Sequence, residues 1–149
     1  MKKLLLAFTC LCVALSCSGL TPTPEQIKEC RQAAEQGDAE AQTTLGMMYS
    51  HGIGVLEDDT EAVNWYRKAA DQGYANAQNN LGVMYDNGEG VLEDHTEAVK
   101  WYSKAAEEGY ANAQTNLGLM YATGSGVAED DVMAYLWWNL AAAQGNEAA

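Results

Sequence analysis

The sequence predicts an all-α protein, an α-solenoid of antiparallel helix pairs with about three repeats and an N-terminal capping helix. Residues 39–74, 75–110 and 111–146 align without a gap, and 24 of 36 positions are identical between the first two copies. Apolar residues within a copy recur at the spacing of one helical face. A fixed period in this range is typical of stacked repeats, each of which buries its apolar face only against its neighbours. Such arrays bind partners along an extended surface.

The first residues have the pattern of an export signal. Lys2 and Lys3 give a basic start, the segment 4–15 is apolar, and a small-x-small tripeptide ends at Ser16. The apolar segment is shorter than the about 20 residues that a bilayer-spanning helix needs. We therefore expect a signal peptide at 1–16 and no transmembrane helix, and we expect the protein to be periplasmic or secreted.

Cys17 suggests an alternative fate for the exported protein. The sequence Val-Ala-Leu-Ser-Cys at 13–17 resembles a permissive bacterial lipobox, in which the cysteine is acylated. In that case residues 17–23 form a tether and the protein is an outer-membrane lipoprotein. In the plainly secreted form, Cys17 and Cys30 could instead pair in an oxidising compartment. The other interpretation of Cys30 is a small buried hydrophobe.

The mature chain is strongly acidic. Loss of Lys2 and Lys3 from the eight basic residues leaves six against 21 acidic residues, a formal charge of −15. This charge repels nucleic acid and anionic lipid headgroups. A nucleic-acid partner is therefore excluded.

Each repeat is predicted to begin with a helix. In the second copy Ala77, Leu81, Met84 and Tyr85 lie at i, i+4, i+7 and i+8, which is one helical face. A glycine within this helix costs about 1 kcal/mol relative to alanine. Its recurrence indicates that another helix crosses closely at this point. The glycine occurs in all three copies: Gly46, Gly82 and Gly118.

A Gly-x-Gly turn and a second helix complete the repeat. The first glycine suits the left-handed conformation that ends a helix. Asp58 and Asp94 precede a glutamate by three residues, the relation of a capping box, whereas Met133 replaces that glutamate in the third copy. We expect the third cap to be weaker. One face of the second helix is apolar: Ala98, Trp101, Tyr102, Ala105 and Ala106.

The two ends of the array differ from its middle. Residues 24–38 align with a second helix and are expected to form a half-repeat that caps the N-terminus of the array at 24–149. Near the C-terminus the last full helix is apolar at positions that are polar in earlier copies, as where Leu136 replaces Lys100. An exposed apolar face is a candidate contact surface. Self-association through the C-terminal helix is therefore a hypothesis.

The repeated motifs resemble one known family. They are Ala-x-Ala-Gln-x-x-Leu-Gly-x-Met-Tyr, then Gly-x-Gly-Val, then Ala-x-x-Trp-Tyr-x-Lys-Ala-Ala-x-x-Gly. The chain is similar to exported bacterial members of the Sel1-like repeat family, which is related to the tetratricopeptide repeat. The third copy departs at Trp138 and Leu140. The resemblance implies a right-handed superhelix whose first helices line the concave side, and a role as adaptor or assembly factor with a protein or peptide partner.

The resemblance also implies which residues face a ligand. They form one stripe along the first helices, at i, i+3, i+7 and i+10, on the side away from the Leu/Tyr packing face. An amphipathic helix would also show such a stripe if its polar side were merely solvated. The ligand-facing candidates are Glu40, Thr43, Met47, Ser50, Asn76, Asn79, Val83, Asp86, Asn112, Thr115, Leu119 and Ala122.

No catalytic, cofactor or metal site is predicted. The Gly-x-Gly pairs lack the third glycine and preceding strand of a dinucleotide site. The acidic triplets at 57–59 and 129–131 could hold calcium only weakly, because Asp58 and Asp130 are expected to cap helices. The functional alternative is a β-lactam-binding or hydrolysing protein, as ascribed to cysteine-rich exported members of the family. No serine after the signal lies in a Ser-x-x-Lys or Gly-x-Ser-x-Gly setting, so a non-enzymatic binding module is preferred.

Overall fold

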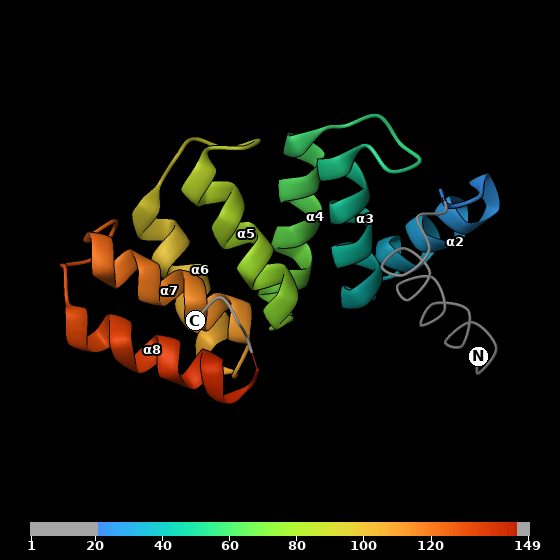
Figure 1. The fold of residues 1–149 in the computed structure, drawn as a ribbon. Coiled ribbons are helices and arrows are strands. Elements are labelled where there is room, and N and C mark those ends of the chain that lie inside the picture. The colour runs from blue at the N-terminus through green and yellow to red at the C-terminus, as the bar shows by residue number, and fades with distance from the viewer. Residues whose placement is uncertain (1–20, 146–149) are drawn as a thin grey trace.

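The computed structural model describes residues 21–145, and this part of the chain is built from helices joined by turns (Figure 1). No strand occurs in it, which confirms the predicted all-α solenoid. The helices, in chain order, are α2 (Pro24–Glu35), α3 (Ala39–His51), α4 (Asp59–Asp71), α5 (Ala75–Asn87), α6 (His95–Glu107), α7 (Ala111–Thr123) and α8 (Asp131–Ala143).

Helices that follow one another in the chain also pack against one another. The most extensive contacts join α3 to α4, α5 to α6 and α7 to α8, so each repeat is a helical hairpin. Contacts of α4 with α5 and of α6 with α7 then connect one hairpin to the next, and α2 packs on α3. The result is a row of hairpins that runs from α2 at one end to α8 at the other (Figure 1).

Aspartates begin the second helices, as predicted, but the capping box is only half formed. The Asp94 carboxylate accepts hydrogen bonds of 3.0 Å from two amides of the first turn of α6. The Glu97 side chain does not bond back to Asp94 and instead pairs with Lys100 at 2.9 Å. Asp130 caps α8 with the same two 3.0 Å bonds. The expectation of a weaker third cap is therefore not met, because no copy uses the glutamate that Met133 replaces.

The turns require both glycines of each Gly-x-Gly pair. Gly88 ends α5 in the left-handed conformation at φ 69°, as predicted for the first glycine. Gly90 also has a positive φ, of 67°, and a Cβ there would lie 2.2 Å from the Asp59 carbonyl oxygen. Gly126 meets the His95 carbonyl oxygen in the same way. The turns of the second and third repeats thus lie against the start of the second helix in the repeat before, where only glycine fits.

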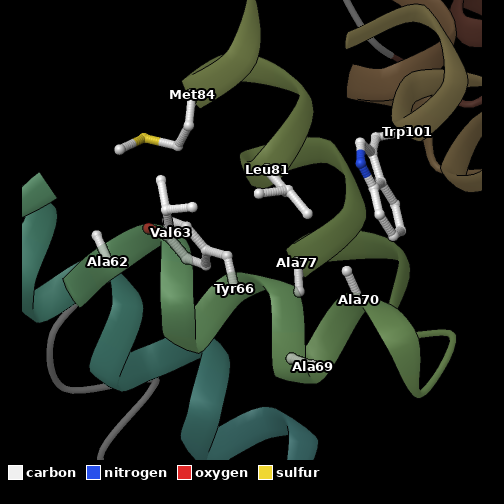
Figure 2. Packing of buried hydrophobic residues seen from close by; sticks show 9 residues of the cluster. All are labelled: Ala62, Val63, Tyr66, Ala69, Ala70, Ala77, Leu81, Met84 and Trp101. Carbon is white, nitrogen blue, oxygen red and sulfur yellow. The ribbon is translucent and has the colours of Figure 1, made fainter. Parts of the chain in front are cut away.

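The core consists of three clusters of small and aromatic side chains, one for each junction along the row. Figure 2 shows the central cluster, which includes Tyr66 and Ala69 of α4 and Leu81 of α5. Trp101 of α6, which pairs with α5 in one hairpin, also belongs to this cluster and is 6% exposed. The predicted apolar face of the second helix is buried in full, since Ala98, Tyr102, Ala105 and Ala106 are each 2% exposed or less.

Cys30 is completely buried, and its thiol donates to the Ala41 carbonyl at a sulfur–oxygen distance of 3.7 Å. This position fits the reading of Cys30 as a small buried hydrophobe. The signal peptide at 1–16 and Cys17 lie outside the described residues, and with them the lipid anchor and the Cys17–Cys30 pair. Between residues 21 and 145 no helix has the length and apolarity to cross a membrane.

Candidate functional site

Two hollows lie side by side between α3 and α5, the first helices of the first two repeats. One has a volume of about 220 Å³ and the other of about 330 Å³, and Asn80 lines both. The first is lined by Glu40, Thr43, Thr44, Met47, Tyr74, Asn76 and Asn80. The second is lined by Ser50, His51, Tyr66, Asn80, Val83, Met84 and Glu89. Together they form a groove, which we call the α3–α5 groove.

A difference between two repeat junctions explains where the groove opens. Between α5 and α7, the Asn116 side-chain amide donates to the Asn79 carbonyl oxygen at 3.1 Å and bridges the two helices. Thr43 is the equivalent of Asn79 on α3, and its hydroxyl donates at 2.8 Å to the Ala39 carbonyl within the same helix. The shorter Thr43 side chain makes no such bridge to Asn80. The amide of Asn80 therefore faces the hollows.

One buried tyrosine, Tyr66, lines the second hollow of the groove. The Tyr66 hydroxyl is 3.3 Å from the Ser50 hydroxyl. Burial raises the pKa of Tyr66, an effect that hydrogen bonds from Ser50 and Asn80 partly oppose. Tyr66 therefore remains a neutral phenol at physiological pH. Its hydroxyl can form hydrogen bonds without carrying a negative charge.

The predicted ligand-facing residues fall into three groups of differing exposure. Two of them, Thr43 and Asn79, are buried between the first helices. Asn76, Asn112 and Leu119 are exposed. The half-buried ones are Glu40, Met47, Ser50, Val83, Asp86, Thr115 and Ala122. The structure brings four of the twelve to the first hollow and two, Ser50 and Val83, to the second.

The prediction missed several residues that line the groove. Asn80 is the most central, and it lies one position after the predicted Asn79. Tyr74, His51 and Glu89 come from helix ends and turns, which the stripe along the first helices did not include. Asn80 could have been found from its spacing, because residues 76, 80 and 83 follow the i, i+4, i+7 pattern as well as the predicted stripe does.

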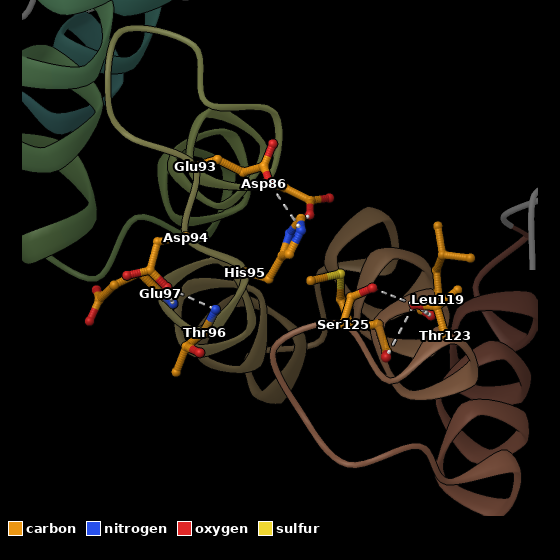
Figure 3. A network of polar contacts seen from close by, with 10 residues as sticks. Asp86, Glu93, Asp94, His95, Thr96, Glu97, Leu119, Thr123 and Ser125 are labelled. Atoms are coloured by element: carbon orange, nitrogen blue, oxygen red, sulfur yellow. Dashed lines mark hydrogen bonds and ion pairs between the residues drawn. The ribbon is translucent and has the colours of Figure 1, made fainter.

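Asp86 has an internal partner. Its carboxylate is 2.8 Å from Nδ1 of His95, and Nε2 of that ring is 3.4 Å from Glu93 (Figure 3). The ring therefore joins the end of α5 to the turn before α6. Burial, followed by the nearby Asp86 carboxylate, raises the pKa of Tyr102. Asp86 thus stabilises its own repeat in addition to any ligand role.

Ser50 and His51 form a hydroxyl–imidazole pair at the edge of the second hollow. The Ser50 oxygen is 2.7 Å from Nδ1 of His51. The same Nδ1 is 3.1 Å from the Met47 carbonyl oxygen, which can only accept. The Ser50 hydroxyl donates to the same carbonyl at 3.2 Å, so its hydrogen points to the backbone. A tautomer in which Nδ1 donates to this carbonyl leaves no lone pair on Nδ1 to accept the Ser50 proton. This geometry differs from that of a nucleophile activated by an adjacent base.

The calcium hypothesis concerns acidic side chains that lie between residues 21 and 145. In that part of the chain no group of three or more His, Cys, Asp or Glu residues is placed to hold a metal ion. The carboxylates of Asp58, Asp94 and Asp130 are engaged in hydrogen bonds to backbone amides at helix starts.

The sequence profile of the Sel1 repeat matches residues 39–74, 75–110 and 111–146. No curated protein sequence matches the chain. The Sel1 repeat profile therefore accounts for most of the described structure.

Solved structures give further similarity. A protective antigen of uropathogenic Escherichia coli with an SLR fold, c5321, is 48% identical over 81% of this chain, with a TM-score of 0.80. A Sel1 repeat protein from Oxalobacter formigenes is 39% identical over 82% of this chain, with a TM-score of 0.77. The matched regions cover 26% and 49% of those two proteins. Helicobacter pylori cysteine rich protein B shares the fold at 23% identity, with a TM-score of 0.65 and coverage of 81% of this chain and 92% of its own.

Proposed function

Because this chain belongs to the Sel1 repeat family, we propose that it is a non-enzymatic module that binds a protein or peptide. The α3–α5 groove supports this proposal most directly. Its two hollows share Asn80 and are lined by residues of two successive repeats, which suits an extended ligand. We propose that the first helices present this groove on the concave side of the superhelix.

The chemistry of the groove suggests how a peptide is held. Asn76 and Asn80 carry amides that can both donate to and accept from a peptide backbone. Met47 and Val83 provide apolar contact between them. The lining includes the carboxylates of Glu40 and Glu89 and no lysine or arginine. A peptide with apolar and basic side chains fits this surface best, and the overall charge of −13 favours the same choice.

The proposed place of action is the bacterial envelope or the exterior of the cell. It rests on the sequence of the first 17 residues, which has the form of an export signal that ends at or before Cys17. Metabolic labelling of cells with a clickable fatty acid tests the lipoprotein form. Incorporation that Cys17→Ala abolishes would establish the anchor.

Capture with matched variants tests the binding proposal. Asn76→Arg with Val83→Arg places a large cation in each hollow, whereas Asn64→Arg adds the same group at an exposed position of α4. Each variant and the unaltered protein are incubated with an extract of the source cells, membranes included, and bound proteins are identified by mass spectrometry. We expect a partner that is retained by the unaltered protein and Asn64→Arg and lost from the groove variant. Equal retention by all three proteins would exclude the groove as the binding surface.

The β-lactam alternative has no specific support in the structure. The only described serine beside an imidazole is Ser50, and its hydroxyl donates to the Met47 carbonyl at 3.2 Å. A nitrocefin assay decides between the two functions. Turnover that Ser50→Ala, Ser103→Ala or Ser125→Ala removes would overturn the non-enzymatic proposal.

A further inference from the structure

A buried glutamine recurs in the first helix of each repeat. In the first and third repeats it uses both ends of its side-chain amide. The Gln42 nitrogen donates to the Ala34 carbonyl at 3.0 Å, and its oxygen accepts from Gln72 at 2.8 Å. Gln114 accepts from Gln144 at the same distance of 2.8 Å. Each of these glutamines is therefore satisfied by a second glutamine 30 residues later.

The middle repeat lacks the second glutamine. Gln78 still donates to the Ala70 carbonyl at 3.3 Å. Position 108, which corresponds to 72 and 144, is glutamate, and an ionised carboxylate cannot donate. The Gln78 side-chain oxygen is buried and has no hydrogen-bond partner, and Gln78 as a whole is only 3% exposed. Buried polar atoms without partners are uncommon and unfavourable, so a donor that bonded to this oxygen would lower the free energy of the protein.

The orphaned oxygen belongs to a hollow that carries excess negative charge. Gln78 lines a hollow of about 360 Å³ at the ends of α4 and α6, and none of the α3–α5 groove residues contributes to it. Asp71, Glu107 and Glu108 line it together with Lys104. The Lys104 ammonium lies 4.0 Å from the centre of the Trp101 ring, where it makes a cation–π contact. Three carboxylates therefore face one cation that is already engaged.

We propose that this hollow binds a cationic nitrogen donor, a guanidinium or primary ammonium group, between Gln78 and Glu108. One N–H of the ligand donates to the Gln78 oxygen, in the place that the Gln72 and Gln144 amides fill in the other repeats. The positive charge pairs with Glu108. A neutral donor would satisfy Gln78 but would gain nothing from the three carboxylates. The site is separate from the α3–α5 groove and does not depend on it.

The side-chain amide signals of Gln78 report on this site directly. In ¹⁵N-labelled protein the Gln42 and Gln114 amides serve as internal controls, because their oxygens already have partners. The probes are the capped tripeptide acetyl-Gly-Arg-Gly-amide, spermidine, and the neutral acetyl-Gly-Gln-Gly-amide, at constant ionic strength. We expect a saturable shift of the Gln78 signals with a cationic probe only. A response to the tripeptide indicates the side chain of a partner protein as the source, and a response to spermidine alone indicates a free polyamine.

Two charge-matched variants complete the experiment. E108Q restores the glutamine found in the other repeats, and we expect it to weaken binding of the cationic probe at least tenfold and to raise the melting temperature. E107Q removes the same charge from the same hollow without supplying that donor, and we expect it to weaken binding only two- to threefold. Equal binding by E108Q and the unaltered protein would overturn the proposal. The absence of any Gln78 shift would also overturn it, because the cationic probes would then not reach the Gln78 oxygen. An equal shift with the neutral tripeptide would overturn it too, because the site would then accept any donor without regard to charge.

Discussion

Tyr102 lies across Gly82 so closely that a Cβ on Gly82 would be 2.6 Å from Cε1 of the ring. Real Cβ atoms essentially never approach a neighbour within 3.0 Å. The first and third repeats show the same relation. The corresponding distances are 2.7 Å for Gly46 with Tyr66 and 2.5 Å for Gly118 with Trp138. The glycine in each first helix is therefore required by the aromatic ring of the second helix.

We expect Gly82→Ala to destabilise the protein by up to about 2 kcal/mol. Alanine favours a helix over glycine by about 1 kcal/mol, but the buried Tyr102 ring must move, and overpacking of this kind costs about 1–3 kcal/mol and sometimes more. Urea denaturation measures the difference. The control is Asn76→Ala at an exposed position of the same helix, which should leave stability within about 0.5 kcal/mol. An increase in stability in Gly82→Ala would contradict the packing relation.

Gly90→Ala is expected to be more damaging than Gly52→Ala. Both glycines have a positive φ, so alanine at either position costs about 1–2 kcal/mol of backbone strain. A Cβ at Gly52 meets its nearest atom at 3.5 Å, whereas at Gly90 it would overlap the Asp59 carbonyl of the preceding repeat. Backbone cannot rotate aside as a side chain does. Thermal unfolding of the two variants should show the larger loss in Gly90→Ala, and equal losses would mean that the turns do not fix the repeats to one another.

The helices and their buried faces could be predicted because each signal was repeated. The spacing of Trp101, Tyr102 and Ala105 marks one face of a single helix, and the same face recurs one period earlier. Packing of this kind depends on residues close together in the sequence. The mid-helix glycines were predicted as helix crossings for the same reason, although their aromatic partners were not.

The groove and the Gln78 hollow depend on pairs that are distant in the sequence. Successive residues on a helix differ by only about 100° in direction, so periodicity could not decide between Asn79 and Asn80. The decision came from Asn116, which lies 37 residues beyond Asn79 and bonds to it. The missing partner of the Gln78 side-chain oxygen likewise becomes apparent only when Glu108, 30 residues away, is known to line the same hollow.

Alkaline pH should reveal the burial of Tyr102. Its pKa is raised in the folded protein, and the value in the unfolded chain is near 10.0. Below pH 10 both states keep the proton, so Tyr102 gives no pH dependence. Above pH 10 only the unfolded chain releases it, so stability falls by about 1.4 kcal/mol per pH unit. Tyr102→Phe should reduce the loss between about pH 10 and pH 11 by up to this amount in urea titrations. An unchanged slope would mean that the hydroxyl ionises in the folded state.

The hypothesis of self-association concerns an exposed apolar stripe on α8. Val132, Leu136 and Leu140 lie at i, i+4 and i+8 and are 69%, 50% and 50% exposed. The equivalent positions on α6 are Thr96, Lys100 and Lys104, and they remain exposed although a further repeat follows them. Stacking of another helix pair on α8 would therefore leave the stripe uncovered. A contact with a separate chain is the arrangement that would cover it.

Sedimentation equilibrium tests this role of the α8 stripe. The acidic charge of each chain opposes pairing at low salt, so association should strengthen at about 0.5 M salt, where the Debye length is only a few Å. Leu136→Lys with Leu140→Lys restores the residues of α6 and should weaken association at least tenfold. Because both positions are half exposed, the melting temperature should change little. Dimers of equal strength in the variant would assign self-association to another surface, and a monomer at all salt concentrations would leave the stripe to a different partner.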